Sequence, residues 1–258
     1  MSTTIHPTAI IDPGAVIGDG SSVGPYAIIE DNVVIGSGTV IKAGAFIGWG
    51  TRLGDNVAVF PSAVIGTIPQ DLKFSGEETT LEIGDRTVIR EYASLNRGTS
   101  ARGRTSVGSD CLLMSYSHVA HDCIVGDHCI LANSATLAGH VTVEDWVIIG
   151  GLVAIHQFVK IGCHVMLGGG WRVPKDVPPY TVAAGDPLKP VDINKVGLSR
   201  RGFSEEAIAN LKKAYRILFR SKRDLSGALE ELDSLGDLGP EVTHLKDFIR
   251  TSERGVIV

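Results

Sequence analysis

The chain has 258 residues, of which 43% are hydrophobic and 21% are charged, and its formal net charge is −5. This length allows one or two domains, and the composition excludes wholesale disorder. The mildly acidic balance disfavours a general role in nucleic-acid binding. Because the sequence has no run of about 18 apolar residues and no basic N-terminal segment, we expect no membrane span, no signal peptide and a cytoplasmic location.

An aliphatic residue recurs at every sixth position from Ile5 to Val173. Val, Ile or Leu occupies 26 of these 29 positions, and the exceptions are Asp71, Glu77 and Ala101. An α-helix repeats about every 3.6 residues and a plain strand about every two, so neither explains a period of six.

This pattern resembles the hexapeptide-repeat family. The resemblance implies that residues 1–186 form a left-handed parallel β-helix, in which three hexads make one triangular coil and each aliphatic side chain points inward. The coils would stack as the repeats of a solenoid do. Glycine often follows the aliphatic residue, as Gly36 and Gly48 do, and we expect it there because a tight corner can require a positive φ.

Two segments interrupt the repeat. Residues 71–82 are polar and charged, and residues 97–106 are basic and small. We expect both to protrude from the β-helix as loops. Loops on a rigid scaffold often carry function, although tolerated insertions would give the same pattern.

After Pro187 and Pro190 the pattern becomes helical, so we expect residues 187–258 to form a small α-helical domain. Helices are predicted over 204–220, with Ser204 as the N-cap, over 224–235 and over 240–252. Residues 189–223 contain 10 Lys or Arg and 3 Asp or Glu, a net charge of +7. This basic segment could receive an acidic partner.

The four cysteines lack the paired spacing of a zinc ribbon or a disulfide framework, so we expect reduced thiols. Cys111 and Cys129 are one full coil of three hexads apart, at inward positions. We therefore expect them to stack in the core and to serve packing.

In coils of three hexads, equivalent positions of successive coils should stack, about 4.8 Å from one another. By this rule His121 lies beside Gly139, and Asp122 lies beside His140. The rule gathers one small patch: His118, His121, Asp122, Gly139, His140, His156 and Gln157. Because His121 and Asp122 lie outside the inward positions, we expect these two residues to be accessible.

Such a patch has the parts of an acyl-transfer site. Histidine exchanges protons near neutral pH, and a neighbouring carboxylate fixes its tautomer. A glycine on the next coil can offer its N–H to a developing oxyanion. The spacing of His118 and His121 would also suit a metal, but Asp122 and Gly139 suit acyl transfer better, so we predict no metal.

Several segments together resemble the family of UDP-N-acetylglucosamine 3-O-acyltransferases, namely SHVAHDCIVGDHCILAN, ATLAGHVTV, AIHQF, VPPY and LSRRGFS in this order. The similarity spans essentially the whole chain. It implies transfer of an (R)-3-hydroxyacyl group from acyl carrier protein to the 3-hydroxyl of UDP-N-acetylglucosamine, the first step of lipid A biosynthesis. It also implies a homotrimer with sites between adjacent subunits, and no cofactor beyond the phosphopantetheine that the carrier protein bears.

The resemblance also implies residue roles. His121 would be the general base, Asp122 would orient it, and the Gly139 N–H would hold the oxyanion. Gly169 would stand at the ruler that measures the acyl chain, and the basic segment would dock the carrier protein. Substrate contacts are expected from Gln70, Asp71, Lys73, His118, His140, His156, Gln157, Asn194, Arg200 and Arg201.

Two positions depart from the family pattern. Asn96 stands where some members have histidine, and Trp171 stands where small residues dominate. Acylation of a 3-amino UDP-sugar, or the activity of another hexapeptide acyltransferase such as one that uses acetyl-CoA, remains an alternative. A non-catalytic β-helix or zinc protein is a further one, and it predicts no loss of activity when His121 is replaced.

Overall fold

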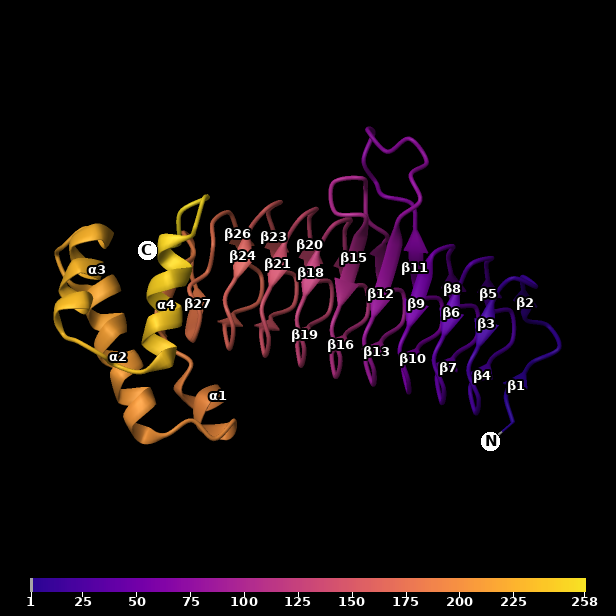
Figure 1. Ribbon diagram of the computed structural model, residues 1–258, viewed down its shortest axis with the longest axis horizontal. Coiled ribbons are helices and arrows are strands. Elements are labelled where there is room, and N and C mark those ends of the chain that lie inside the picture. The colour runs from indigo at the N-terminus through magenta and orange to yellow at the C-terminus, as the bar shows by residue number, and fades with distance from the viewer. Residues whose placement is uncertain (1) are drawn as a thin grey trace.

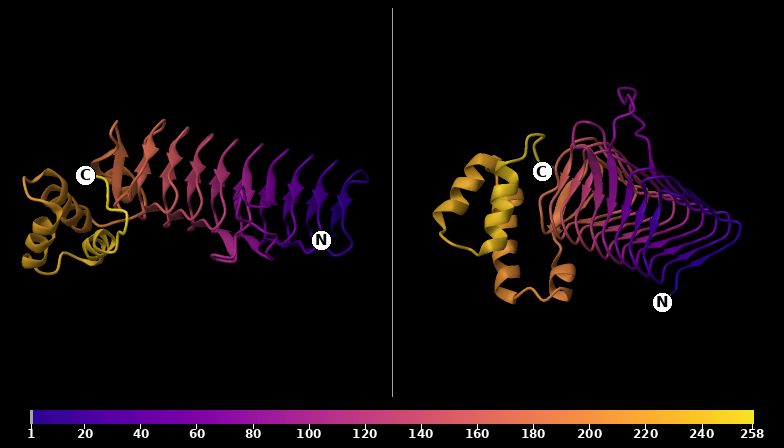
Figure 2. Two further views of the ribbon diagram at one scale, coloured as in Figure 1. Left: turned by 90° about the horizontal axis from the view of Figure 1, so that it is seen from above. Right: turned by 45° about the vertical axis from the view of Figure 1, so that its right-hand side comes forward.

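A computed structural model describes residues 2–258 and shows a long prism of short strands with helices at one end (Figure 1). The N-terminus lies at the far end of the prism from the helices, and both views in Figure 2 show the coils stacked along one axis. No helix within the described residues is long and apolar enough to cross a membrane.

Three sheets form the sides of the prism. The eleven-stranded sheet contains β1 (Thr4–Ile5), β4 (Ser22–Val23), β7 (Val40–Ile41), β10 (Ala58–Val59), β13 (Val88–Ile89), β16 (Leu112–Leu113), β19 (Ile130–Leu131), β22 (Ile148–Ile149), β25 (Met166–Leu167), β27 (Thr181–Ala184) and β28 (Lys189–Ile193). The nine-stranded sheet contains β2 (Ile10–Ile11), β5 (Ile28–Ile29), β8 (Phe46–Ile47), β11 (Val64–Thr67), β14 (Ser94–Asn96), β17 (His118–Val119), β20 (Thr136–Leu137), β23 (Ala154–Ile155) and β26 (Arg172–Val173). The eight-stranded sheet contains β3 (Val16–Ile17), β6 (Val34–Ile35), β9 (Thr51–Leu53), β12 (Thr80–Ile83), β15 (Arg104–Val107), β18 (Ile124–Val125), β21 (Thr142–Val143) and β24 (Lys160–Ile161).

The strand register explains why the hexad repeat survives its two interruptions. Stacked partners are three hexads apart in a regular coil, as in the pair Ile10 and Ile28. The pair Val64 and Ser94 is five hexads apart, and the pair Ser94 and His118 is four hexads apart. The first loop therefore adds two hexads to its coil, and the second adds one. Because both insertions are whole hexads, they interrupt the repeat without shifting its phase.

The corners of the prism are made by residues with a positive φ, among them Tyr26, Asn32 and Asn56. The expectation that the glycines following the aliphatic residues supply this φ holds for Gly66, whose φ is 78°, but is wrong for Gly36 and Gly48, which have ordinary φ values. Glycine is needed there because successive coils approach closely. A Cβ at Gly36 would collide with the carbonyl oxygen of Gly54, and one at Gly48 would lie 2.5 Å from the carbonyl oxygen of Gly66.

The repeating aliphatic side chains fill the inside of the prism, where Ile29, Ile47 and Leu131 are almost fully buried. The first coil is open at its end, and Ile5 is 50% exposed there. At the other end, β27 continues the eleven-stranded sheet and pairs antiparallel with β28, which closes the stack. The chain thus forms the predicted left-handed parallel β-helix followed by helices.

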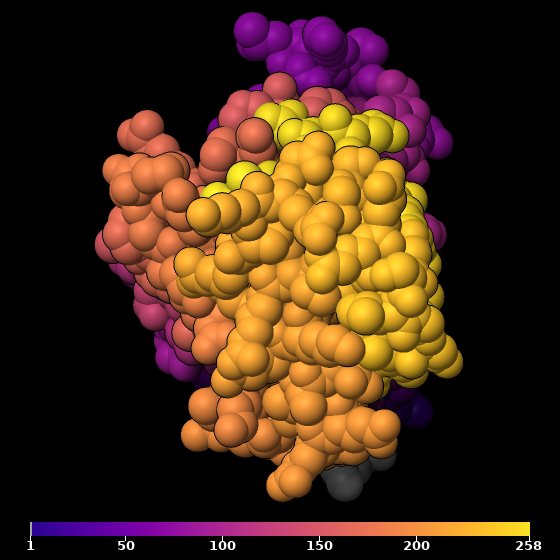
Figure 3. All heavy atoms as spheres, turned by 90° about the vertical axis from the view of Figure 1, so that its left-hand side faces the viewer, coloured from indigo at the N-terminus to yellow at the C-terminus, as the bar shows by residue number. Residues whose placement is uncertain are grey.

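The helices α1 (Lys195–Arg200), α2 (Glu205–Arg220), α3 (Leu225–Ser234) and α4 (Pro240–Arg250) cover this end of the prism, as Figure 3 shows. Ser204 caps α2 as predicted, since its hydroxyl accepts a hydrogen bond from the Ala207 N–H. The sequence did not predict α1, a six-residue helix with Gly197 in its middle, because it is too short for an apolar period. A second apolar cluster, which includes Leu198, Leu211 and Phe248, joins the helices to Tyr180 of the last coil.

The two loops end earlier than the sequence suggested, because β12 begins at Thr80 and β15 at Arg104. They comprise residues 68–79 and 97–103. Both connect the nine-stranded sheet to the eight-stranded sheet, so they rise from the same edge of the prism (Figure 1).

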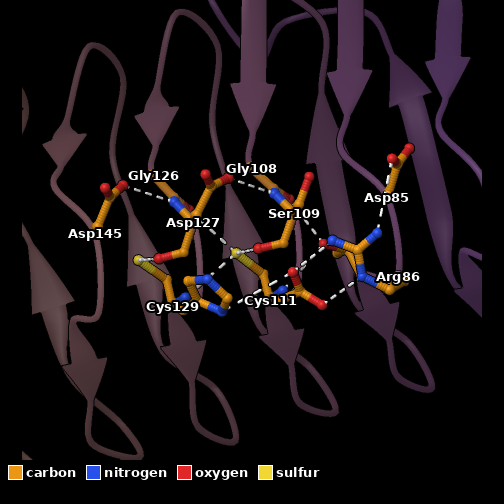
Figure 4. A network of polar contacts seen from close by, with 12 residues as sticks. Asp85, Arg86, Gly108, Ser109, Cys111, Gly126, Asp127, Cys129 and Asp145 are labelled. Atoms are coloured by element: carbon orange, nitrogen blue, oxygen red, sulfur yellow. Dashed lines mark hydrogen bonds and ion pairs between the residues drawn. The ribbon is translucent and has the colours of Figure 1, made fainter. Parts of the chain in front are cut away.

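The edge between the eight-stranded and eleven-stranded sheets carries a ladder of aspartates (Figure 4). Each carboxylate accepts the N–H of the preceding coil, as Asp127 does from Ser109 at 2.7 Å and Asp145 does from Asp127 at 2.8 Å. Cys111 and Cys129 stack beside this ladder as buried free thiols, as predicted. The Cys129 N–H donates to the Cys111 sulfur at 3.4 Å.

Candidate active site

One edge of the prism gathers most of the predicted site residues. It consists of the turns from the nine-stranded to the eight-stranded sheet, and we call it the histidine edge: residues 68–79, 97–103, 120–123, 138–141 and 156–159. The register of β17 with β20 places His118 beside Thr136, and the turns that follow therefore stack His121 on Gly139 and Asp122 on His140. The rings of His121 and His140 meet edge to face, with centroids 5.1 Å apart.

His121 and Asp122 form a close pair at this edge. Nδ1 of His121 lies 2.8 Å from Oδ2 of Asp122, so the carboxylate accepts the ring N–H and leaves Nε2 free as a base. The side chain of His121 is 15% exposed, which gives a substrate access to it.

Asp122 itself is fully buried, so the expectation that it would be accessible is wrong. The loop 97–103 folds over it. The Thr99 N–H donates to Oδ1 at 3.0 Å, and the Thr99 hydroxyl donates to Oδ2 at 2.6 Å. The Asp122 N–H in turn donates to the Thr105 hydroxyl at 2.8 Å, which holds the corner in its positive φ of 59°.

The hydrogen bonds around Asp122 decide its charge. Burial raises the pKa of this carboxyl, but hydrogen bonds from Thr99 and His121 outweigh burial and hold the pKa below its ordinary value. Asp122 is therefore ionised at neutral pH and can stabilise an imidazolium that forms on His121.

Gly139 lies directly under the His121 ring. A Cβ at position 139 would come within 2.6 Å of Cε1 and 2.7 Å of Nε2 of that ring. Among residues 2–258 the Gly139 N–H finds no acceptor, although the residue is buried. An unpaired N–H next to a candidate base is suited to bind an oxyanion.

Two further histidines flank the pair. Nδ1 of His118 lies 2.8 Å from the Ser94 hydroxyl, and burial lowers the pKa of His118. His140 stacks on Phe158 with ring centroids 4.5 Å apart. Burial also lowers the pKa of His140 and outweighs the opposing influence of Asp122, whose Oδ2 lies 3.7 Å from His140 Nε2. Both rings are thus favoured as neutral hydrogen-bonding groups.

His156 and Gln157 are exposed one coil further on, toward the helices. The C-terminal segment reaches His156, because Nη2 of Arg254 lies 3.3 Å from Nδ1 of His156 and also donates to the Pro174 carbonyl. Because the side chains of His156 and Gln157 are exposed, the histidine edge is open to solvent at this end.

The loop 68–79 carries the predicted residues Gln70, Asp71 and Lys73. Gln70 and Lys73 are exposed, and Asp71 is half-buried and accepts a hydrogen bond from the Lys73 N–H. Asn96, where the family pattern was broken, is buried at the base of this loop. Its side-chain amide donates to the Thr67 hydroxyl at 2.9 Å and to the Ile68 carbonyl at 3.0 Å.

A single chain does not bring the remaining predicted residues to the histidine edge. Asn194 is buried at the edge between the eight-stranded and eleven-stranded sheets, where its amide donates to the His164 carbonyl. Arg201 lies over the Trp146 ring at the same edge, and Arg200 is exposed beside it in α1. Gly169 is exposed at the third edge, near the carbonyl of Gly151.

Sequence reasoning missed the residues that support the pair. Thr99, Thr105 and Ser94 hold Asp122 and His118, but they lie in or beside the irregular loops, where the stacking rule of three hexads does not apply. Ser94 could have been found, because a loop that adds one hexad stacks it on His118. Thr99 left no signal in the sequence pattern.

The ligand atoms of His121, Asp122 and His140 lie within 4.8 Å of one another, so distance alone would allow a metal ion. Both oxygens of the Asp122 carboxylate are already used, however, because Oδ1 accepts the Thr99 N–H and Oδ2 accepts the Thr99 hydroxyl and the His121 ring N–H. This arrangement favours a residue that orients the histidine over a metal ligand.

Comparisons with known proteins agree with this geometry. Residues 176–257 match the family model of domain 2 of UDP-N-acetylglucosamine O-acyltransferases, and residues 14–48 and 104–139 match the bacterial transferase hexapeptide repeat. The chain is 46% identical to a UDP-N-acetylglucosamine acyltransferase from Bacteroides fragilis, with a TM-score of 0.94 over 98% of this chain and 99% of that one.

Two other solved structures are similar in the same way. The acyltransferase from Acinetobacter baumannii is 44% identical, with a TM-score of 0.94 over 98% of this chain and 99% of that one. The Arabidopsis UDP-N-acetylglucosamine acyltransferase is 34% identical, with a TM-score of 0.88 over 98% of this chain and 100% of that one. With identities at this level over nearly its whole length, the chain is an acyltransferase and belongs to the UDP-N-acetylglucosamine O-acyltransferase family.

Proposed function

We propose that this enzyme transfers an (R)-3-hydroxyacyl group from acyl carrier protein to the 3-hydroxyl of UDP-N-acetylglucosamine, the first step of lipid A biosynthesis. One structural observation supports the proposal in addition to family membership. Nδ1 of His121 is held 2.8 Å from the buried carboxylate of Asp122, and its ring lies against Gly139, whose N–H is free. A base, an orienting group and an oxyanion donor thus meet at one point.

The mechanism follows from this arrangement. Nε2 of His121 takes the proton from the sugar 3-hydroxyl while the sugar oxygen attacks the thioester carbon. The carbonyl oxygen becomes an oxyanion, which the Gly139 N–H stabilises. When the C–S bond breaks, the imidazolium of His121 returns the proton to the leaving thiol. No acyl-enzyme forms, and Asp122 stays ionised throughout.

The histidine edge offers the contacts that would position both substrates. His118, His140 and Gln157 line it, and Gln70, Asp71 and Lys73 belong to the loop 68–79, which rises from the same edge. We assign these residues, together with His156, to acceptor and acyl contacts. The phosphopantetheine of the donor is the only prosthetic group that the reaction uses, and no metal takes part.

We further propose that the enzyme is a homotrimer whose sites lie between adjacent prisms. In one chain Asn194, Arg200 and Arg201 lie at a different edge from His121, and Gly169 lies at the third edge. A threefold assembly that brings different edges of neighbouring prisms together would complete each site with residues from two chains. Arg200 and Arg201 would then meet a phosphate, and Gly169 would limit the acyl chain.

The donor fits the charge of the helical end. Residues 189–223 carry a net charge of +7, within a chain of net charge −5. A basic surface of this kind steers an acidic carrier protein toward the site and increases the association rate. A cytoplasmic location belongs to the same proposal, because free thiols such as Cys111 persist in a reducing compartment.

Acyl transfer by the wild type and by the His121→Ala variant tests the proposal. The donors are 3-hydroxyacyl carrier proteins of several chain lengths, and the mass of the product is measured. We expect an ester on UDP-N-acetylglucosamine and a loss of at least ~100-fold in the variant. Product formed only with a 3-amino sugar or with acetyl-CoA would replace the proposed substrates. Full activity of the variant would remove His121 as the base.

A further inference from the structure

A second cluster of ligating side chains lies away from the histidine edge, where helix α4 meets the prism. Glu144 follows β21, Cys163 follows β24 on the next coil, and His244 is on α4. Oε2 of Glu144 lies 2.8 Å from Nε2 of His244, and it accepts the Cys163 N–H at 2.7 Å. The carboxylate oxygen, the thiol sulfur and the imidazole nitrogen all lie within 4.8 Å of one another.

From this geometry we propose that Glu144, Cys163 and His244 bind a zinc ion that fastens helix α4 to the β-helix. Sulfur, imidazole nitrogen and carboxylate oxygen together are the donors that zinc prefers, whereas magnesium and calcium take oxygen alone. Around a tetrahedral zinc such atoms lie roughly 3.3–3.7 Å from one another. The three side chains would reach these positions by small rotations.

The surroundings suit an ion that is bound at a junction. Glu144 and Cys163 are fixed by two successive coils of the prism, and the Tyr180 ring packs edge-on against His244 with centroids 6.0 Å apart. The side chains of Glu144 and His244 are 32% and 38% exposed. Zinc can therefore enter from solvent, and water can occupy the fourth position.

The site would act on stability and not on the reaction. His244 is 100 residues from Glu144 in the chain, so one ion would cross-link the helical end to the prism. Glu144 and Cys163 share their edge with Asn194 and Arg201, but none of the three ligands is among the residues assigned to catalysis or substrate contacts. Metal binding is thus independent of the function proposed above, so an experiment can refute the zinc site without refuting the proposed reaction, and the reverse.

Metal titration of the full-length, metal-free protein tests the site. We expect one zinc per chain and, with zinc at about 100 times its dissociation constant, a rise in Tm of roughly 5 °C or more. Cobalt in place of zinc should give the ultraviolet charge-transfer band of a thiolate ligand. Uptake should be stronger at pH 8 than at pH 6, since the metal displaces protons from its ligands.

Variants identify the ligands. Cys163→Ser should abolish the cobalt–thiolate band, and His244→Gln should abolish the zinc-dependent rise in Tm, while both keep acyltransferase activity within about twofold. His6→Gln, at an exposed histidine of the first coil, is the matched control. Because the other candidate cluster within residues 2–258 contains His121, the titration is repeated with His121→Ala, which should bind zinc normally. A missing thiolate band, or uptake that survives Cys163→Ser, would overturn the proposal.

Discussion

Gly139 has little freedom to change. A methyl group there would press on the His121 ring, since the Cβ would come within 2.6 Å of Cε1. The φ of Gly139 is ordinary, so the backbone can accommodate alanine. The methyl group would clash only with the His121 ring. We expect Gly139→Ala to lower kcat by at least ~100-fold, because the base moves away from its working position.

Measuring kcat and Tm together separates this effect from misfolding. Gly227→Ala in α3 is a suitable control, since its Cβ would meet only the Asp224 carboxylate, at 3.0 Å. The control should keep both kcat and Tm. If Gly139→Ala were fully active, the free N–H and the close ring at this position would have no part in catalysis.

Asp122 should matter to both catalysis and stability. Asp122→Asn keeps the shape of the side chain but can donate a hydrogen bond to Nδ1 of His121, which would place the proton on the wrong nitrogen. We expect a loss of about 10²–10⁴ in kcat. The variant also loses charge-assisted hydrogen bonds from Thr99 and His121, at a cost of about 2 kcal/mol at pH 7.

The pH dependence of this cost has a definite sign. The pKa of Asp122 is lower in the folded protein than in the unfolded chain, where it is about 3.9. The ionised carboxylate therefore stabilises the fold fully above that value, and the contribution is lost as the pH falls through the folded pKa. The difference in urea midpoint between wild type and Asp122→Asn should be constant above about pH 5 and should shrink toward pH 3. A difference that stays constant down to pH 3 would contradict a stabilising charge on Asp122.

At the scale of elements, the sequence predicts whatever the hexad repeat controls. The coils, their stacking and the meeting of His121 with Gly139 follow from the aliphatic positions. The conformations of the two loops could not be predicted, because they depend on side-chain contacts that are not part of the hexad repeat. Thr99 covers Asp122, and Asn96 fixes the start of the loop 68–79 through Thr67 and Ile68. The sequence therefore predicts the position of Asp122 on the β-helix but not its burial.

The loop 68–79 is an insertion that the fold does not need. Joining Thr67 to Thr80 would remove two hexads and restore a regular coil, because Val64 and Ser94 would then be three hexads apart. We expect this deletion to change the Tm by no more than a few degrees and to raise the KM for UDP-N-acetylglucosamine at least ~10-fold, because Gln70, Asp71 and Lys73 leave the site. Thermal unfolding and steady-state kinetics measure the two effects. Unchanged kinetics would show that the loop makes no substrate contact.

At the scale of the molecule, different edges of the prism carry different functional residues. The histidine edge carries the base, its orienting residue and the oxyanion donor. The edge between the eight-stranded and eleven-stranded sheets carries Arg201, held over Trp146 at 5.0 Å, and the junction with α4. A prism of three flat sides can pack with copies of itself, so residues on different edges of one chain can meet across an interface.

This division leads to a complementation experiment. His121→Ala and Arg201→Ala should each be inactive alone, since each removes one part of every site. After the two are unfolded together in equal amounts and refolded, a mixed trimer contains interfaces where one chain supplies His121 and its neighbour supplies Arg201. Random mixing makes about a quarter of all interfaces intact, so we expect about a quarter of the wild-type activity. Sites confined to single chains would give no recovery at all, and mixing His121→Ala with Asp122→Asn should give none either, because both residues come from the same chain.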